Sequence, residues 1–228
     1  MQTVKIIKKN EVNFSFRVKK ILDTFDINEQ KGNFEKEFKI DIPQKFNIGV
    51  IYGSSGSGKS TLAKELFKEN IITDTTFSWN KKNSFIDDFP KEKTFDEIYK
   101  CLFSIGLSSI PSWLRPYDVL SNGEKMRANL ARALLTYDFF VFDEYTSVVN
   151  REVAKSCSIA LSKYAKQNNK KIILLSCHKD IIEFLEPDFT FCMDTFQQNF
   201  HLAHVLHSNF TLKNVGEKIG KNLAFITI

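Results

Sequence analysis

The chain has 228 residues, of which 43% are hydrophobic and 26% charged, and a formal net charge of +5. This length allows one domain with a substantial core, and the composition of an ordinary globular protein excludes a disordered or fibrous chain. No run of about 18 apolar residues occurs, and residues 1–10 lack the apolar region of a secretory signal, so we expect neither a membrane span nor a secreted protein.

The charge and the cysteines add weaker constraints. A mild positive charge is compatible with a nucleic-acid partner but does not require one. The four cysteines are scattered without a CxxC pair, which predicts reduced thiols in a cytoplasmic protein.

Strands and helices are predicted to alternate along most of the chain. Strands are expected at residues 13–18, 34–42, 47–52, 139–142 and 171–175. Helices are expected at residues 59–69, 94–104, 122–135 and 150–167. The pattern predicts an α/β fold with a mainly parallel sheet, preceded by antiparallel N-terminal strands. We expect one domain over residues 1–190, with a helical arm at about 90–135, and a C-terminal extension of unassigned role over residues 191–228.

Residues 53–61 fit the pattern G-x-x-x-x-G-K-[ST] between a predicted strand and a predicted helix. In such a loop the backbone N–H groups surround the β-phosphate, the lysine reaches the β- and γ-phosphates, and the hydroxyl ligates magnesium. Lys59 and Ser60 are predicted to take the last two roles. The residues assigned to ATP are Gly53, Ser54, Ser55, Gly56, Ser57, Gly58, Lys59, Ser60 and Thr61.

The apolar strand at 139–142 ends in two carboxylates, Asp143 and Glu144. Behind a phosphate-binding loop, Asp143 is predicted to hold Mg²⁺ and Glu144 to orient and polarise the attacking water.

A third motif, Leu-Ser-Asn-Gly-Glu at residues 120–124, precedes a predicted helix. Together with the first two motifs it resembles the signature of ATP-binding-cassette proteins. In that family the signature serine and glycine, at a helix N-terminus, contact the γ-phosphate bound by the partner subunit. The resemblance implies this role in trans for Ser121, Asn122, Gly123 and Glu124. A capping box made by Ser121 and Glu124 explains the same residues without a nucleotide.

The order of the remaining motifs also resembles this family, over residues 13–187. Residues 145–150 resemble its D-loop, and His178 stands where its switch histidine contacts the γ-phosphate and the attacking water. The resemblance implies an ATPase that binds MgATP in a head-to-tail homodimer. Residues 111–116, and residues 146–149 followed by Arg151, resemble a branch of soluble bacterial and phage cassette ATPases that are not transport subunits.

Several positions depart from the family pattern. The glutamine that supplies a further magnesium ligand is missing; Asn80, after a predicted strand ending at residues 77–79, is either its substitute or the start of a turn. Asn122 replaces a glycine of the signature. Asn150 replaces the D-loop aspartate, so a charge that couples the two sites in the family is lost. Asn150 either has a functional role in the D-loop or caps the next helix.

The sequence indicates less clearly which residue stacks on adenine and whether the histidines bind a metal. Phe25 is our choice for the aromatic residue that stacks on adenine, ahead of Phe34, whose alternation fits a core position. His201 and His204 share a helix face, as a metal site requires, with His207 off that face. Because no carboxylate or cysteine lies among the three, solvated surface histidines are the favoured interpretation.

The segment between Lys59 and Ser121 is shorter than in transport subunits of the family. This favours a soluble switch in a process related to nucleic acids or to defence, with a nucleic acid or another protein as partner. The alternative is the nucleotide-binding subunit of a transporter. A third class, a P-loop kinase, leaves residues 120–124 and His178 unexplained.

Overall fold

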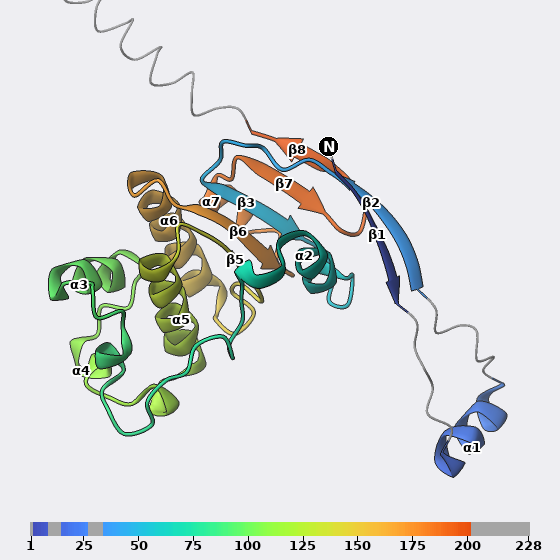
Figure 1. Ribbon diagram of the computed structural model, residues 1–228, viewed down its shortest axis with the longest axis horizontal. Coiled ribbons are helices and arrows are strands. Elements are labelled where there is room, and N and C mark those ends of the chain that lie inside the picture. Colours follow the sequence, from blue (N-terminus) through green and yellow to red (C-terminus); the bar gives the residue numbers. More distant parts are fainter. Residues whose placement is uncertain (1, 9–14, 27–33, 202–228) are drawn as a thin grey trace, which may run out of the picture.

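The computed structural model describes residues 2–8, 15–26 and 34–201 (Figure 1). Its strands are β1 (Gln2–Lys8), β2 (Phe34–Ile40), β3 (Ile48–Tyr52), β4 (Ile71–Ile72), β5 (Phe139–Phe142), β6 (Lys171–Ser176), β7 (Phe189–Cys192) and β8 (Gln198–Phe200). Its α-helices are α1 (Phe16–Phe25), α2 (Lys59–Phe67), α3 (Phe95–Ser104), α4 (Ile110–Trp113), α5 (Asn122–Thr136), α6 (Arg151–Gln167) and α7 (Ile182–Leu185). Short 3-10 turns lie at Lys68–Asn70, Phe85–Asp88 and Tyr117–Val119.

The main sheet has the strand order β4-β5-β6-β3-β7-β8. Its first five strands run parallel, and β8 pairs antiparallel with β7. A separate antiparallel pair joins β1 to β2. The predicted α/β class, with a mainly parallel sheet and antiparallel strands before it, is confirmed. Within the described residues, no helix is long and apolar enough to cross a membrane.

Both faces of the main sheet are covered, as its near-continuous apolar strands require. On β6, Ile172 and Leu174 belong to a core shared with α3, α5 and α6. Ile173 and Leu175, which point the other way, belong to a core shared with α2 and β2. Figure 1 shows α5 and α6 on one side of the sheet and α2 on the other. The period of two along each strand therefore divides one apolar run between two cores.

Two predicted strands are wrong. Instead of a strand over 13–18, Ser15 caps α1 by accepting a hydrogen bond from the Val18 N–H (3.3 Å), and residues 13 and 14 lie outside the described part. Residues 77–79 form no strand. On the side of β5 away from β6, the neighbouring strand is the two-residue β4. The strand β1 was not predicted.

The sheet also extends beyond the predicted domain boundary. Residue 190 lies inside β7, which pairs directly with β3 at the centre of the sheet, and β8 continues the sheet to Phe200. Residues 191–200 therefore belong to the same fold rather than to an extension.

The centre of the sheet depends on one close approach of backbone to ring. Gly49 on β3 is the register partner of Phe189 on β7, and a Cβ at Gly49 would lie 2.3 Å from Cζ of Phe189. Phe189 is fully buried. Only a residue without a side chain leaves room for this ring.

We therefore expect Gly49→Ala to lower the free energy of unfolding by about 1–3 kcal/mol, the usual cost of overpacking a core. Urea denaturation measures it. In the double variant with Phe189→Leu, the added methyl group should cost less than it does alone. A Gly49→Ala chain as stable as the parent would contradict the close approach.

Candidate functional site

Three motifs meet at the carboxyl edge of the parallel sheet. The loop of residues 53–61 follows β3, Asp143 and Glu144 follow β5, and His178 follows β6. These strands lie in the order β5-β6-β3, so their ends are adjacent. Ligands of parallel α/β sheets bind at this edge.

The phosphate-binding loop is closed by its own lysine. Gly56 and Gly58 have φ angles of +76° and +98°, which glycine adopts at low cost, and they turn the loop into α2. Lys59 is 6% exposed, and its Nζ donates to the backbone oxygens of Gly53 (2.9 Å) and Ser54 (2.8 Å). The ammonium group is thereby held against the loop at the start of α2, where an anion is favoured.

Two predicted magnesium ligands are in direct contact. The Ser60 hydroxyl donates to Asp143 Oδ1 at 3.0 Å, and the Glu144 N–H donates to the same oxygen at 2.9 Å. A hydroxyl and a carboxylate side by side next to the phosphate-binding loop are the oxygen donors that Mg²⁺ takes. Ser60 and Asp143 therefore fit a magnesium site.

Asn80, the third predicted ligand, has another role. Its Oδ1 accepts the N–H groups of Lys82 (2.8 Å) and Asn83 (3.2 Å), so the alternative interpretation, the start of a turn, is the one the structure shows. The Asn80 side-chain oxygen is thus used within the turn, and the structure gives no support to its assignment to magnesium.

Two residues after β4 share a cavity with the carboxylates and were not predicted from the sequence. Thr73 and Asp74, directly after β4, line a cavity of about 540 Å³ together with Asp143 and Glu144. Asn122 of the signature lines the same cavity. The signal was a polar pair after Ile71-Ile72, but two residues are too few to predict a strand.

Glu144 stands on a backbone turn anchored in the core. Its φ is +55°, and the next residue, Tyr145, is fully buried. The Tyr145 N–H donates to the Leu175 carbonyl (2.9 Å), and its hydroxyl lies 3.1 Å from Ser158 Oγ. The exposed carboxylate of Glu144 is thus presented to the cavity from a fixed base.

One buried serine joins the ends of β5 and β6. Ser176 Oγ donates to the Tyr145 carbonyl (3.1 Å) and accepts the His178 N–H (3.0 Å). Ser176 is 1% exposed, whereas His178 is half-buried. The backbone of His178 is therefore held next to the turn that carries Glu144.

The signature residues begin α5 with the capping box that the sequence predicts. Ser121 Oγ accepts the Glu124 N–H (3.3 Å), and Glu124 Oε2 accepts the Ser121 N–H (2.9 Å). A hydrogen bond from Ser112 is the main cause that lowers the pKa of the Glu124 carboxyl, which keeps it ionised. The role of Ser121, Asn122 and Gly123 in trans stays a prediction.

The signature also touches the D-loop of its own chain. A Cβ at Gly123 would lie 3.1 Å from Val149 Cγ1. Asn150, next along the chain, caps α6, since its Oδ1 accepts the Val153 N–H at 2.8 Å. Of the two interpretations of Asn150, the cap is confirmed.

Phe25 does not lie where the sequence placed it. It ends α1 with 69% of its surface exposed, and Figure 1 shows α1 apart from the sheet and from the loop after β3. The choice of Phe25 as the adenine platform is therefore wrong in this structure. The side chain of Phe34 lies outside the described part.

The histidine cluster is largely outside the described residues as well. His201 is exposed and its N–H donates to the Asp188 carbonyl (2.8 Å), whereas His204 and His207 are not described. Among the described residues, no group of three histidine, cysteine, aspartate or glutamate side chains could hold a metal ion.

A carboxylate from the far end of the chain holds the start of the phosphate-binding loop. Asp194, two residues after β7, accepts the Ser54 N–H (2.9 Å) and the Ser54 hydroxyl (2.7 Å). The adjacent Met193 N–H donates to the Tyr52 carbonyl (2.8 Å), so this turn is fixed to β3. No local pattern indicates such a contact.

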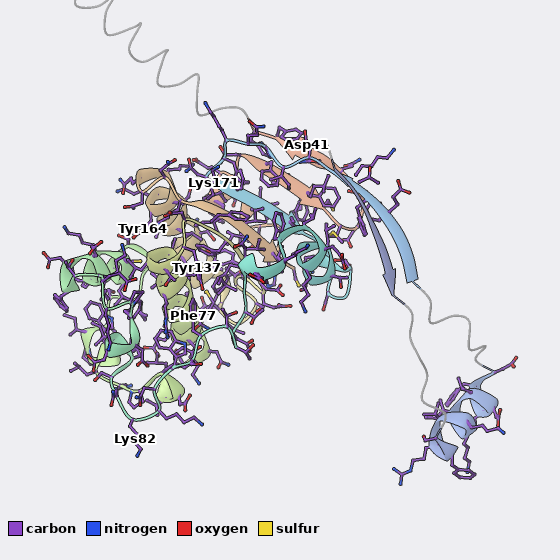
Figure 2. All side chains as sticks on the ribbon, in the orientation of Figure 1. Asp41, Phe77, Lys82, Tyr137, Tyr164 and Lys171 are labelled. Atoms are coloured by element: carbon purple, nitrogen blue, oxygen red, sulfur yellow. The ribbon has the colours of Figure 1, made fainter. Side chains whose placement is uncertain are left out.

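The segment between β4 and α5 is held by aromatic stacking. Arg132 lies over the rings of Phe77 and Trp79, 4.9 and 4.7 Å from their centroids, and donates to the Ser78 carbonyl (3.0 Å). Phe77 stacks on Tyr137, both labelled in Figure 2, with centroids 6.5 Å apart. Residues 77–79 are thereby fixed to the helix that begins with the signature.

Comparison with known proteins agrees with the order of motifs and with the fold described above. No family model matches the chain. The chain is 26% identical over 171 residues to a cytochrome c biogenesis ATP-binding export protein of Reclinomonas americana, covering 60% of this chain and 75% of the relative. It is 26% identical over 215 residues to a putative ABC transporter ATP-binding protein of Listeria monocytogenes, covering 78% of this chain and 75% of the relative.

Solved structures show the same fold. The dimeric structure of MJ0796, a bacterial ABC transporter cassette, superposes with a TM-score of 0.52 at 14% identity, covering 69% of this chain and 87% of that one. Its post-hydrolysis state bound to ADP and Pi superposes with a TM-score of 0.57 at 15% identity, covering 74% and 91%.

Removing the lysine that closes the loop should weaken nucleotide binding. We expect Lys59→Ala to raise the Kd for ATP at least about tenfold, because the ammonium group is the one buried cation of the loop. Titration with a fluorescent ATP analogue measures this. Lys64→Ala, at an exposed position of the same helix, serves as the control. Unchanged affinity in Lys59→Ala would refute the phosphate assignment.

Proposed function

Because the chain belongs to the ATP-binding-cassette superfamily of ATPases, we propose that it binds MgATP as a head-to-tail dimer and hydrolyses it to ADP and phosphate. The observation that carries the proposal is the meeting of the loop at 53–61, the pair Asp143–Glu144 and His178 at one edge of the sheet. These are the parts that phosphoryl transfer to water needs.

Each part has a separate role. Backbone N–H groups of residues 56–61 and the Lys59 ammonium bind the β- and γ-phosphates. Ser60 and Asp143 would hold Mg²⁺, which neutralises charge on the phosphates when bound. Glu144 accepts a proton from the water that it orients, and His178 contacts the γ-phosphate from the neighbouring strand end.

The dimer completes the site. Ser121 is exposed at the N-terminus of a 15-residue helix, where N–H groups and the helix dipole favour an anion. We assign Ser121, Asn122 and Gly123 to the γ-phosphate of a second copy. One dimer then holds two nucleotides, each between two chains.

For the process, we propose a soluble switch related to nucleic acids or to defence, in which ATP closes the dimer and hydrolysis reopens it. The support is the reduced arm: in the described chain between α2 and α5, the α-helices are α3 and the four-residue α4. A nucleic acid or a second protein would be the partner.

A transport subunit is the second candidate, and one structural feature favours it. Phe95, Tyr99 and Phe103 form an aromatic row along α3, with exposures of 63%, 37% and 41%. Both relatives named above carry transport or export in their names. An exposed aromatic row suits a protein partner.

Glu144→Gln tests the chemistry. We expect ATP binding to persist while turnover falls about a hundredfold or more, because the amide cannot accept the proton. The variant should accumulate as an ATP-bound dimer in size-exclusion chromatography. Normal turnover would remove Glu144 from the role of base.

Adding Ser121→Arg to Glu144→Gln provides the control for the dimer. The arginine should block the contact in trans and leave the variant monomeric with ATP bound. A dimer that persists would contradict the head-to-tail arrangement.

The trapped dimer also tests the process. We expect Glu144→Gln with MgATP to retain nucleic acid or a soluble protein from a cell extract, whereas the double variant with Ser121→Arg should not. Sequencing and mass spectrometry identify the bound molecules. Copurification of a multi-span membrane protein that stimulates the ATPase would establish the transport alternative instead.

A further inference from the structure

The turn that carries Glu144 and the segment that carries His178 are joined at two places. The first is the buried Ser176 hydroxyl, which bonds to the Tyr145 carbonyl and the His178 N–H. This junction lies at the strand ends. Beyond it the two segments leave the sheet separately, one as the D-loop and the other toward α7.

The second junction is an ion pair farther along both segments. Arg151, the first residue of α6, donates through Nε to Asp180 Oδ2 at 2.9 Å, and Nη2 contacts both carboxylate oxygens. Asp180 lies two residues after His178. Among the ion pairs of the described residues, this one connects the D-loop side of the site with the histidine side.

The exposure of this pair argues against a mainly stabilising role. The Arg151 and Asp180 side chains are 42% and 52% exposed, and exposed ion pairs contribute little to stability. Two-nitrogen contact with a carboxylate does fix orientation, however, because the guanidinium is planar and its donors are rigidly spaced. The hydrogen bonds from Arg151 also lower the pKa of the Asp180 carboxyl, so the pair stays charged.

The D-loop, residues 145–150, contains no charged side chain, and its last residue is Asn150. Asn150 is uncharged, and its Oδ1 accepts the Val153 N–H at the start of α6. Arg151 is the first charged residue after the D-loop, and its charge is directed to the histidine segment of the same chain.

We propose that Arg151 and Asp180 are positioning residues that fix the His178 segment to the D-loop, so that a D-loop moved by the partner subunit carries His178 with it. The proposal rests on the proposed ATPase function. Ser176 fixes the near end of the histidine segment and the ion pair its far end. Loss of the pair frees the far end while the phosphate-binding loop stays intact.

A charge-exchange experiment on the chain of 228 residues tests this. Asp180→Asn and Arg151→Gln should each lower kcat about tenfold, the scale of loss when a reacting group is misplaced by a fraction of an ångström. The Kd for ATP should stay unchanged, as should the melting temperature. The double variant Arg151→Asp/Asp180→Arg should recover most of kcat because it restores the pair in reverse.

Asp138→Asn serves as the matched control. The Asp138 side chain is 98% exposed and pairs with Lys170 at 2.8 Å. Asp138 precedes β5 and so lies at the opposite end of the strand from Asp143 and Glu144, and its substitution should leave kcat unchanged. Recovery in the exchanged variant separates positioning from a general loss of folding.

The outcomes separate the two proposals. A parent chain without ATPase activity would refute the proposed function itself. An active parent whose single variants keep full kcat, or whose exchanged variant stays as slow as the single variants, would overturn the role of the ion pair alone.

Discussion

The double-sided burial of the parallel sheet is the constraint on which the rest of the structure depends. Alternate residues of β6 enter different cores. Ile172 and Leu174 pack in the core shared with α3, α5 and α6, whereas Ile173 and Leu175 pack in the core shared with α2 and β2. A slip of one residue would exchange the two sets, so the register is strongly specified. Because β3, β5 and β6 keep this register, three segments that are distant in sequence end side by side, and their polar residues come together as one candidate site.

Motifs made of consecutive residues could be predicted from the sequence, as could long helices and strands with a regular apolar repeat. The loop at 53–61, the strand before Asp143 and the capping box of Ser121 each depend on local spacing, and the structure shows each of these elements. The helix α1 was mistaken for a strand because its apolar residues Val18, Ile21, Leu22 and Phe25 recur with helical spacing only over a longer window than residues 13–18. Position in space, which excludes Phe25 from the nucleotide site, has no local signature.

Contacts between distant segments could not be predicted in the same way. Thr73 and Asp74 reach the site because β4 pairs with β5, which places Ile71 beside Val141 although the whole helical arm lies between them in the sequence. Asp194 reaches Ser54 because β7 crosses over to lie beside β3. Asn80 shows the converse: its hydrogen bonds belong to a local turn, which the sequence offered as one of two interpretations, whereas the resemblance to a family position suggested a distant ligand.

The contact between Asp194 and Ser54 links the pairing of β7 with β3 to the binding of nucleotide by the loop. The Asp194 carboxylate holds the loop only while β7 stays paired with β3, so local opening of the β3–β7 pairing, a form of fraying, releases the start of the loop. By linkage, a ligand that needs the ordered loop must in turn suppress that fraying. Slower amide exchange in β7 would then report occupancy of a loop that lies about 140 residues earlier in the chain.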